Sequence, residues 1–384
     1  MEALTNDFLQ AQRAIGDPLA DDAVAEMIAE RGVEGARALF DLLIRQVETP
    51  LDDLPPSVHA FLTATSQLPA WANPAKIALA QKVFIDHGPK LLIILYYQSL
   101  PMLYACAQGA EVLVRTARLT HGQGRDEWQV FTRRVAETAQ FLLGVMAPDA
   151  LQPNGPGIQL IQKIRLIHAS VRFFLQARGD WAVDDLGVPI NQEDMAITVC
   201  SFGVSPLAGL ERIGIVLSPE EREAYVHCWS AIGQVMGVQD ALLPQHVQEA
   251  QQLEQAILAR QEKPSTAGQT LTSALLQFGQ SVMPREELKV TPQGLLQFFS
   301  GPDRAQLLGV MPNYGCISWL IPEVLAALFR SGERLEDRSS EGLNKLFNRL
   351  SLATMRAMFR FFDEYKNRHF YVPPSLRDVW GISE

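Results

Sequence analysis

Apolar residues recur at intervals of three and four along almost the whole chain, and the alternation typical of strands is almost absent. That interval places apolar side chains on one face of a helix. The sequence therefore predicts an all-α protein, a multi-helical bundle. In the first third, helices are expected over 21–45 with a break at Arg31-Gly32, from Pro55-Pro56 onward, over 74–87 with a stop at Gly88-Pro89, and over 90–119 with a bend at Pro101.

The same pattern continues to the C-terminal third. Helices are predicted over 125–146 and 158–177, joined by a turn rich in Pro and Gly, and then over 195–210, 219–236, 244–260 and most of 288–361. Two starts carry capping signals: Asn191 before two acidic residues, and Ser218-Pro219-Glu220-Glu221. The segment 263–268 is the best candidate for a boundary. We expect an N-terminal helical region (1–67), a central core (68–262) and a C-terminal region packed on it (263–384).

The net charge of the chain bears on whether it binds nucleic acid. The 384 residues include 43 acidic and 33 basic side chains, a net charge of −10, and no basic run. Nucleic-acid binding requires clustered Lys and Arg against the phosphates. We therefore expect no nucleic-acid partner. The sequence leaves the oligomeric state open.

The cysteines and the apolar runs bear on location. Cys106, Cys200, Cys228 and Cys316 form no CxxC pair, so buried free thiols are expected rather than a disulfide framework or zinc site. The N-terminus has no apolar export segment. The run 91–107 is short for a membrane span of about 20 residues, and polar residues interrupt it. These features predict a cytoplasmic protein with no transmembrane segment.

The segment 161–175 carries the clearest candidate chemistry. Arg165, His168 and Arg172 are spaced by three and four, so a helix presents them on one face among apolar residues. A haem iron takes a neutral imidazole as axial ligand, and Arg pairs well with carboxylates such as the haem propionates. His168 is thus a candidate iron ligand between two propionate partners. The alternative is a structural polar stripe that pairs with acidic residues elsewhere.

A second element precedes that helix. Arg134 and Thr138 lie four residues apart on a predicted helix, beside apolar residues that would face a core. A guanidinium and a hydroxyl there could hydrogen-bond dioxygen or a peroxide on the open side of a haem. The alternative is an ordinary surface pair.

Together these residues resemble the catalytic core of the latex-clearing-protein family of bacterial rubber oxygenases. A related branch contains fungal membrane-bound MpaB-type oxygenases that cleave a prenyl side chain in mycophenolic acid biosynthesis. The resemblance covers roughly 68–238 and rests on Arg134, Thr138, Arg165, His168 and Arg172 in this order, together with the stretches 99–104, 109–113, 191–194 and 225–237.

The resemblance implies an all-helical fold with a globin-like core that binds haem b, with His168 as the iron ligand and Arg165 and Arg172 beside it. It implies catalytic roles for Arg134 and Thr138. Glu137 stands where rubber-degrading members have a Lys, which puts polyisoprene cleavage in doubt; Glu137 is a candidate proton-transfer group.

The expected activity is that of a haem-dependent dioxygenase, with dioxygen as co-substrate. It would cleave a C=C bond of an isoprenoid or other unsaturated apolar small molecule into two carbonyls. The alternatives are a haem protein with a peroxidase-like, sensing or carrier role, and a helical scaffold without catalysis. Leu95, Leu100, Met102, Phe202 and Met236 are candidate pocket walls, with core packing as the default, and His227 is either a polar contact near the site or a core histidine.

Overall fold

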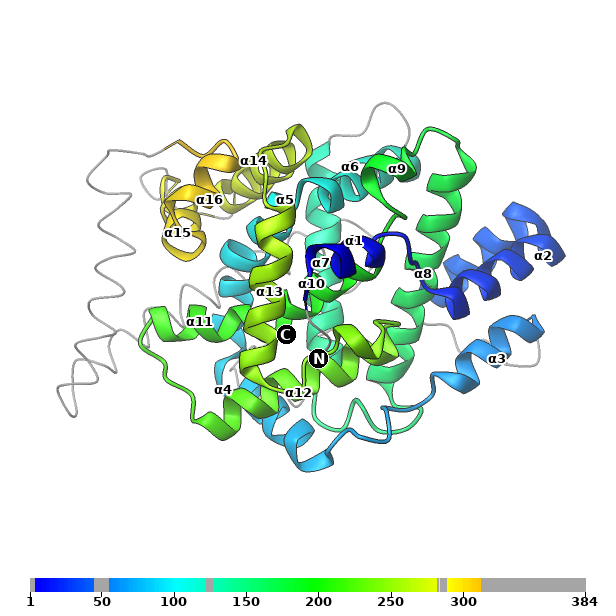
Figure 1. Ribbon diagram of the computed structural model, residues 1–384, viewed down its shortest axis with the longest axis horizontal. Helices are drawn as coiled ribbons and strands as arrows, with labels where there is room; N and C mark the ends of the chain where they lie inside the picture. The colour runs from blue at the N-terminus through cyan, green and yellow to red at the C-terminus, as the bar shows by residue number, and fades with distance from the viewer. Residues whose placement is uncertain (1–3, 45–54, 122–126, 282, 284–288, 312–384) are drawn as a thin grey trace.

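The computed structural model describes residues 4–44, 55–121, 127–281, 283 and 289–311. All regular secondary structure in these residues is helical, apart from an isolated antiparallel bridge between Cys106 and Glu262. The prediction of an all-α fold is confirmed (Figure 1). The first half contains α1 (Asn6–Gln12), α2 (Pro18–Ile44), α3 (Pro56–Ala64), α4 (Pro74–Ile94), the π-helical turn η2 (Leu95–Ser99), α5 (Leu100–Ala105), α6 (Ala107–His121), α7 (Glu127–Val145) and α8 (Pro156–Ala177).

The second half continues the same architecture with shorter helices. They are α9 (Val183–Leu186), α10 (Gln192–Gly203), α11 (Ser205–Arg212), α12 (Pro219–Val235), η3 (Asp240–Leu242), α13 (Val247–Gln261), α14 (Thr266–Ser281), α15 (Thr291–Ser300) and α16 (Pro302–Leu307). The single helix predicted over 195–210 is two helices in the structure, separated at Val204. Predicted elements beyond residue 311 lie outside the described residues.

Local signals in the sequence set several boundaries as predicted. Gly32 interrupts α2 with φ 67° and ψ 173°, outside the helical region. The Asn191 side chain accepts a hydrogen bond from the backbone N–H of Asp194 at the start of α10. Ser218 and Glu221 form a reciprocal capping box on α12. These contacts satisfy backbone N–H groups that would otherwise lack partners at the helix ends.

The predicted stop at Gly88-Pro89 is wrong. Helix α4 runs through both residues and ends only at Ile94. Proline in a helix interior removes one backbone hydrogen bond and is unfavourable by about 3 kcal/mol in isolation. Here Pro89 is buried, and the turns that follow it contribute Leu91, Ile93 and Ile94 to the core. Burial of these side chains outweighs the local cost of the proline.

The bend predicted at Pro101 is distributed over a longer stretch. The π-helical turn Leu95–Ser99 precedes Pro101, which lies in the first turn of α5. Cys106, with ψ 87°, then separates α5 from α6. Just before this break, the Ala105 carbonyl accepts a hydrogen bond from the backbone N–H of Lys263 at 3.0 Å. This bond connects the segment that follows α13 to the end of α5.

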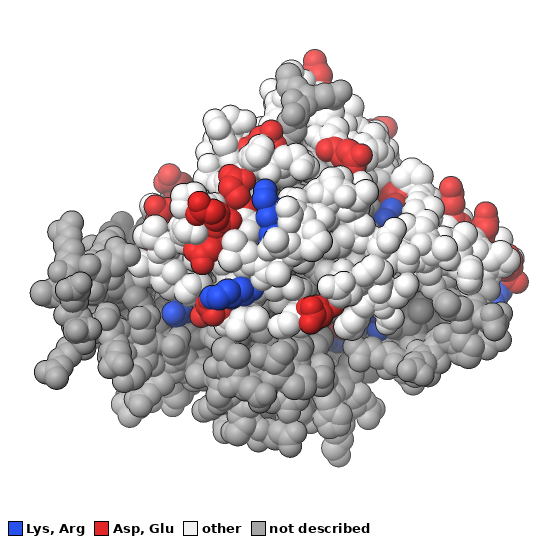
Figure 2. Space-filling model, turned by 90° about the horizontal axis from the view of Figure 1, so that it is seen from below, with Lys and Arg blue, Asp and Glu red and all other residues white. Residues whose placement is uncertain are grey.

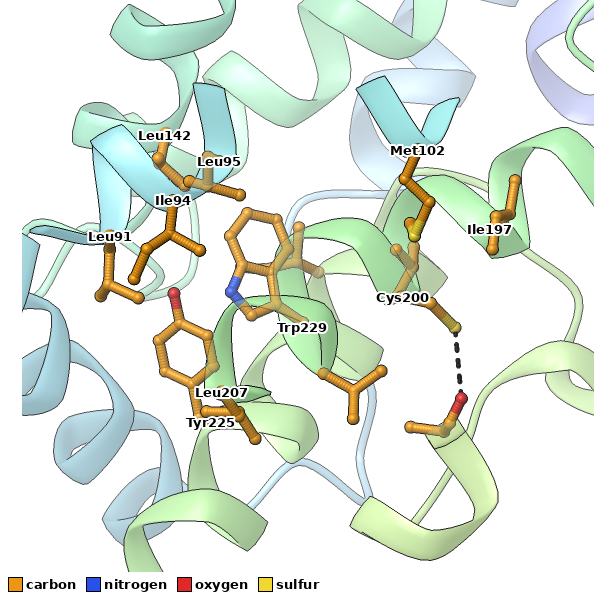
Figure 3. Packing of buried hydrophobic residues seen from close by; sticks show 14 of the residues in the cluster. Leu91, Ile94, Leu95, Met102, Leu142, Ile197, Cys200, Leu207, Tyr225 and Trp229 are labelled. Atoms are coloured by element: carbon orange, nitrogen blue, oxygen red, sulfur yellow. Dashed lines mark hydrogen bonds between the residues drawn. The ribbon is translucent and has the colours of Figure 1, made fainter. Parts of the chain in front are cut away.

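A single large apolar cluster fills the centre of the bundle (Figure 3). Trp229 of α12 belongs to it together with Leu91 and Ile94 of α4, and Phe202 of α10 stacks on Trp229 with a centroid distance of 4.9 Å. Helices α4 and α12 lie along one another, and α14 packs on α6 and α7. The segment after residue 262 therefore contacts the helices that precede α8.

The thiols, the hydropathy of the helices and the surface charge can be compared with the sequence interpretation. Cys106, Cys200 and Cys228 are buried and free, as predicted, whereas Cys316 lies outside the described residues. Among the helices that the structure describes, none combines the length and the hydropathy needed to cross a membrane. On the face shown in Figure 2, the coloured Lys and Arg side chains are scattered among carboxylates and form no continuous patch.

Candidate functional site around His168

Helix α8 places the three candidate site residues. It begins after Gly155 with Pro156 in its first turn, and it ends before Gly179, which has φ +71°. Its neighbours are α2 and α7, which pack along different sides of it (Figure 1). His168 lies near the middle of α8, with Arg165 about one turn before it and Arg172 about one turn after it.

His168 has the properties of a neutral ligand. Its ring is half-buried, and Nδ1 is buried without a hydrogen-bond partner. Burial and the charge of Arg172 lower the pKa of His168 to about 4, and Asp17 opposes this shift. The imidazole is therefore neutral at pH 7 and has a lone pair available. Among the described residues, no group of three or more His, Cys, Asp or Glu side chains could hold a metal ion. One neutral imidazole is sufficient for a haem iron, which needs only one protein ligand on this side. His87 also has a buried Nδ1 without a partner and a pKa lowered by burial, but it lies on α4, away from the Arg165–Arg172 motif.

Arg165 is bound to a carboxylate of the chain itself. Its Nε and Nη2 donate to the two oxygens of Asp17 at 2.6 and 2.7 Å, and Nη1 donates to the Val235 carbonyl at 2.8 Å. Both side chains of this ion pair are buried. Every nitrogen of the guanidinium is thus engaged within the protein.

Arg172 is held in a similar way from the other end of the motif. Its Nε donates to Asp21 at 2.6 Å, and Nη1 donates to the Ile190 carbonyl at 3.1 Å. Nη2 lies 3.9 Å from an Asp17 oxygen and makes no hydrogen bond although it is buried. The structure therefore directs both arginines towards acidic side chains, the arrangement of the alternative interpretation. Their role as propionate partners stays a prediction.

Arg134 and Thr138 lie on α7, which packs against α8. Arg134 Nη1 donates to the Leu113 carbonyl of α6 at 2.6 Å, and Nη2 donates to the Thr116 hydroxyl. Burial lowers the pKa of Arg134, which stays charged because arginine titrates far above neutral pH. Thr138 is half-buried on the next turn. The guanidinium is thus anchored between helices and is not part of an exposed pair with Thr138.

Glu137 has a different environment. Its side chain is exposed and accepts a hydrogen bond from Nε of Arg133 at 2.8 Å, a surface pair four residues apart. Proton transfer at a buried haem would require the carboxylate to face inward. The structure places it outward, so the geometry gives no support to that predicted role.

His227 and the candidate pocket walls are part of the packed interior. Nε2 of His227 accepts a hydrogen bond from the backbone N–H of Asn73 at 2.8 Å, and the ring contacts Trp71 edge-on. His227 is thus buried and hydrogen-bonded, as in the second of the two alternatives, a core histidine. The five wall candidates belong to the central apolar cluster or pack directly against it: Leu95, Leu100, Met102, Phe202 and Met236.

A buried ionic cluster joins the end of α1 to α10 and α13, and the sequence analysis did not predict it. Arg13 donates to Glu193 at 3.0 Å and to Asp194 at 2.9 Å, and Arg260 donates to the other Glu193 oxygen at 3.0 Å. Burial is the largest cause of the raised pKa of Asp194, and Arg13 opposes it. The only signal in the sequence was a pair of acidic residues, Glu193 and Asp194, in the first turn of an otherwise apolar helix. The sequence interpretation used these two residues only as part of the capping signal after Asn191.

The comparisons with known proteins identify the class. Residues 93–360, more than two thirds of the chain, match the model of the family described as "ER-bound oxygenase mpaB/B'/Rubber oxygenase, catalytic domain". The chain belongs to this family of oxygenases. The matched region begins within the predicted core and extends well past residue 263, and the division into three regions stays a prediction.

Two relatives add detail. The chain is 24% identical over 264 residues to the rubber oxygenase of Streptomyces sp. (strain K30), an alignment that covers 68% of this chain and 63% of that protein. The chain thus spans less than two thirds of that relative's length. The solved structure of latex clearing protein in the closed state has the same fold, with a TM-score of 0.72 at 20% identity, covering 90% of this chain and 91% of the other.

Proposed function

We propose that the protein is a haem b-dependent oxygenase that cleaves a C=C bond of an isoprenoid or another unsaturated apolar small molecule, with dioxygen as co-substrate. Membership of the oxygenase family supports the reaction class. The observation that carries the cofactor assignment is the buried, unpartnered Nδ1 of a neutral His168. A buried polar atom without a partner is unfavourable by about 1–3 kcal/mol, so such an atom calls for an explanation.

The haem would be held by His168, and when bound it would supply the redox chemistry that activates dioxygen. His168 remains unprotonated well below neutral pH, so no proton competes for its lone pair. Apolar side chains of α7 and α8 belong to the central cluster, and walls of this chemistry would suit both a porphyrin and an apolar substrate.

Arg134 and Thr138 are proposed to contact the reacting oxygen. The hydrogen bonds from Arg134 to Leu113 and Thr116 fix the guanidinium before any substrate arrives. A donor that is already oriented stabilises developing negative charge without reorganisation. Thr138 would add a short hydroxyl donor one turn later on α7. Glu137 has no part in this proposal because its side chain is exposed and paired with Arg133.

The absorption spectrum of the purified protein tests the cofactor assignment. We expect a Soret band in the wild type that His168→Ala abolishes or strongly weakens. His246→Ala is the matched control, because His246 is exposed and pairs only with Glu223 near the surface. A protein that stays colourless after hemin is supplied, or a Soret band unchanged in His168→Ala, would refute the assignment.

Oxygen uptake with carbonyl formation from squalene- or carotenoid-like chains tests the reaction. Haem binding without turnover of any such polyene would favour the peroxidase-like, sensing or carrier role instead. The cytoplasmic location expected from the sequence belongs to the same proposal, and fractionation of the source cells tests it.

A further inference from the structure

The two arginines beside His168 meet their partners in a segment that lies before the region matched by the oxygenase family. Asp17 and Asp21 stand at the start of α2, whereas the matched region begins at residue 93. Asp17 bonds Arg165 through both carboxylate oxygens, and Asp21 bonds Arg172. The N-terminal segment thus binds α8 through ion pairs on both sides of His168.

The two carboxylates are themselves held in place. The backbone N–H of Asp17 donates to Asp21 at 2.9 Å, so the two acidic residues form one unit. The adjoining chain is fixed on α10 and the loop before it, because the backbone N–H groups of Val188 and Gln192 donate to the carbonyls of Arg13 and Ile15 at 2.8 and 3.0 Å. The carboxylates therefore act as fixed points and not as mobile surface groups.

Close packing leaves little freedom in this contact. A Cβ atom on Gly237 would lie 2.6 Å from Asp17 Oδ2 and 2.8 Å from Arg165 Nε. A Cβ atom on Gly16 would lie 2.8 Å from Asp21 Oδ2 and 3.1 Å from Arg172 Cδ. All four distances are shorter than ordinary van der Waals contact, so the backbone approaches the ion pairs as closely as glycine permits.

We propose that Asp17, with Asp21, is a positioning residue for His168. By binding Arg165 and Arg172, the acidic pair fixes the rotation and position of α8, and so the direction of the imidazole. In this view the arginines orient the ligand helix and do not bind haem propionates. The part of this inference that concerns haem binding rests on the proposed function. The effect of Asp17 and Asp21 on the stability of α8 can be measured without haem.

The first test is hydrogen exchange of the haem-free protein. Asp17→Asn should accelerate amide exchange in α8 around His168 and leave α14 unchanged. Asp22→Asn is the matched control, because Asp22 is a neighbouring carboxylate on α2 that is exposed. If Asp17→Asn perturbs the whole fold, Asp21→Asn provides the milder variant, since its side chain is one-third exposed. Unchanged exchange in α8 with either variant overturns the proposal.

The second test is a hemin titration followed at the Soret band. Groups that orient a metal ligand typically change metal affinity by about 10- to 100-fold, and we expect a loss in this range for Asp17→Asn. The same substitution should have no effect in a His168→Gly protein supplied with free imidazole, because that ligand is not attached to α8. An equal loss in both backgrounds would indicate a general role in stability and overturn the proposal.

The sign of the effect distinguishes the two roles of the arginines. If Arg165 and Arg172 bound the propionates, removing a competing carboxylate would tighten hemin binding; tighter binding by Asp17→Asn therefore overturns the proposal. A wild type that takes up no haem refutes the proposed function alone, because amide exchange in α8 still decides whether Asp17 holds the helix.

Discussion

Gly237→Ala offers a quantitative test of the buried ion pair between Asp17 and Arg165. Gly237 has φ +98°, and a methyl group there would approach both partners of a hydrogen bond that is 2.6 Å long. A side chain at positive φ is unfavourable by about 1–2 kcal/mol. Breaking a buried ion pair is unfavourable by about 3–5 kcal/mol, because charges stay buried without partners. Together these costs are about 4–7 kcal/mol, and restriction of the unfolded chain offsets about 0.4–1 kcal/mol of them, so the expected loss in the free energy of unfolding is about 3–7 kcal/mol.

Gly179→Ala is the matched control. Gly179 has φ +71°, but no atom lies within 4 Å of the position that its Cβ would occupy. The control carries the backbone strain alone, about 1–2 kcal/mol. Both substitutions also restrict the unfolded chain, which restores about 0.4–1 kcal/mol in each and cancels in the difference. The difference between the two variants therefore isolates the ion pair.

Urea unfolding of both variants and the wild type, followed by circular dichroism at equal protein concentration, provides the measurement. We expect Gly237→Ala to lose about 3 kcal/mol or more beyond Gly179→Ala. Equal losses in the two variants would show that the close approach of Gly237 to Asp17 and Arg165 has no energetic consequence. The argument that the Asp17–Arg165 ion pair holds α8 in place would then fail.

Two other predictions concern α13 and α7. Burial raises the pKa of Glu254 on α13 from 4.5 to about 7. Between these two pH values the folded state keeps a proton that the unfolded state has released. The free energy of unfolding therefore falls as the pH rises from 4.5 to about 7. Glu254→Gln should remove this dependence on pH. In urea unfolding we expect the variant to be more stable than the wild type by about 1–3 kcal/mol at pH 8 and equally stable at pH 4. A difference in stability that does not change with pH would contradict the raised pKa of Glu254. Arg134→Ala should retain most haem by its Soret band but lose dioxygen uptake with a polyene, and retained uptake would contradict the oxygen-contacting role.

The local features of the fold were predictable because they depend on residues close together in the chain. The capping box at Ser218 and the interruption of α2 at Gly32 follow from short-range hydrogen bonding and backbone geometry. The bounds predicted for the helix that carries His168 agree with α8 to within a few residues. The continuation of α4 through Pro89 was not predictable in this way, because it depends on apolar partners from α12.

The candidate site divides along the same line. By itself, the sequence determined that Arg165, His168 and Arg172 share one stretch of helix, since a period of 3.6 residues follows from local hydrogen bonding alone. Only the tertiary structure decided what that stretch faces. Asp17 and Arg165 are 148 residues apart in the chain, and Glu137 could have faced inward or outward on the same helix. The direction and the partner of each charged side chain depend on which distant helices pack around it. A buried charge is stable only when it is paired, and its partner can come from any part of the chain that the fold brings near.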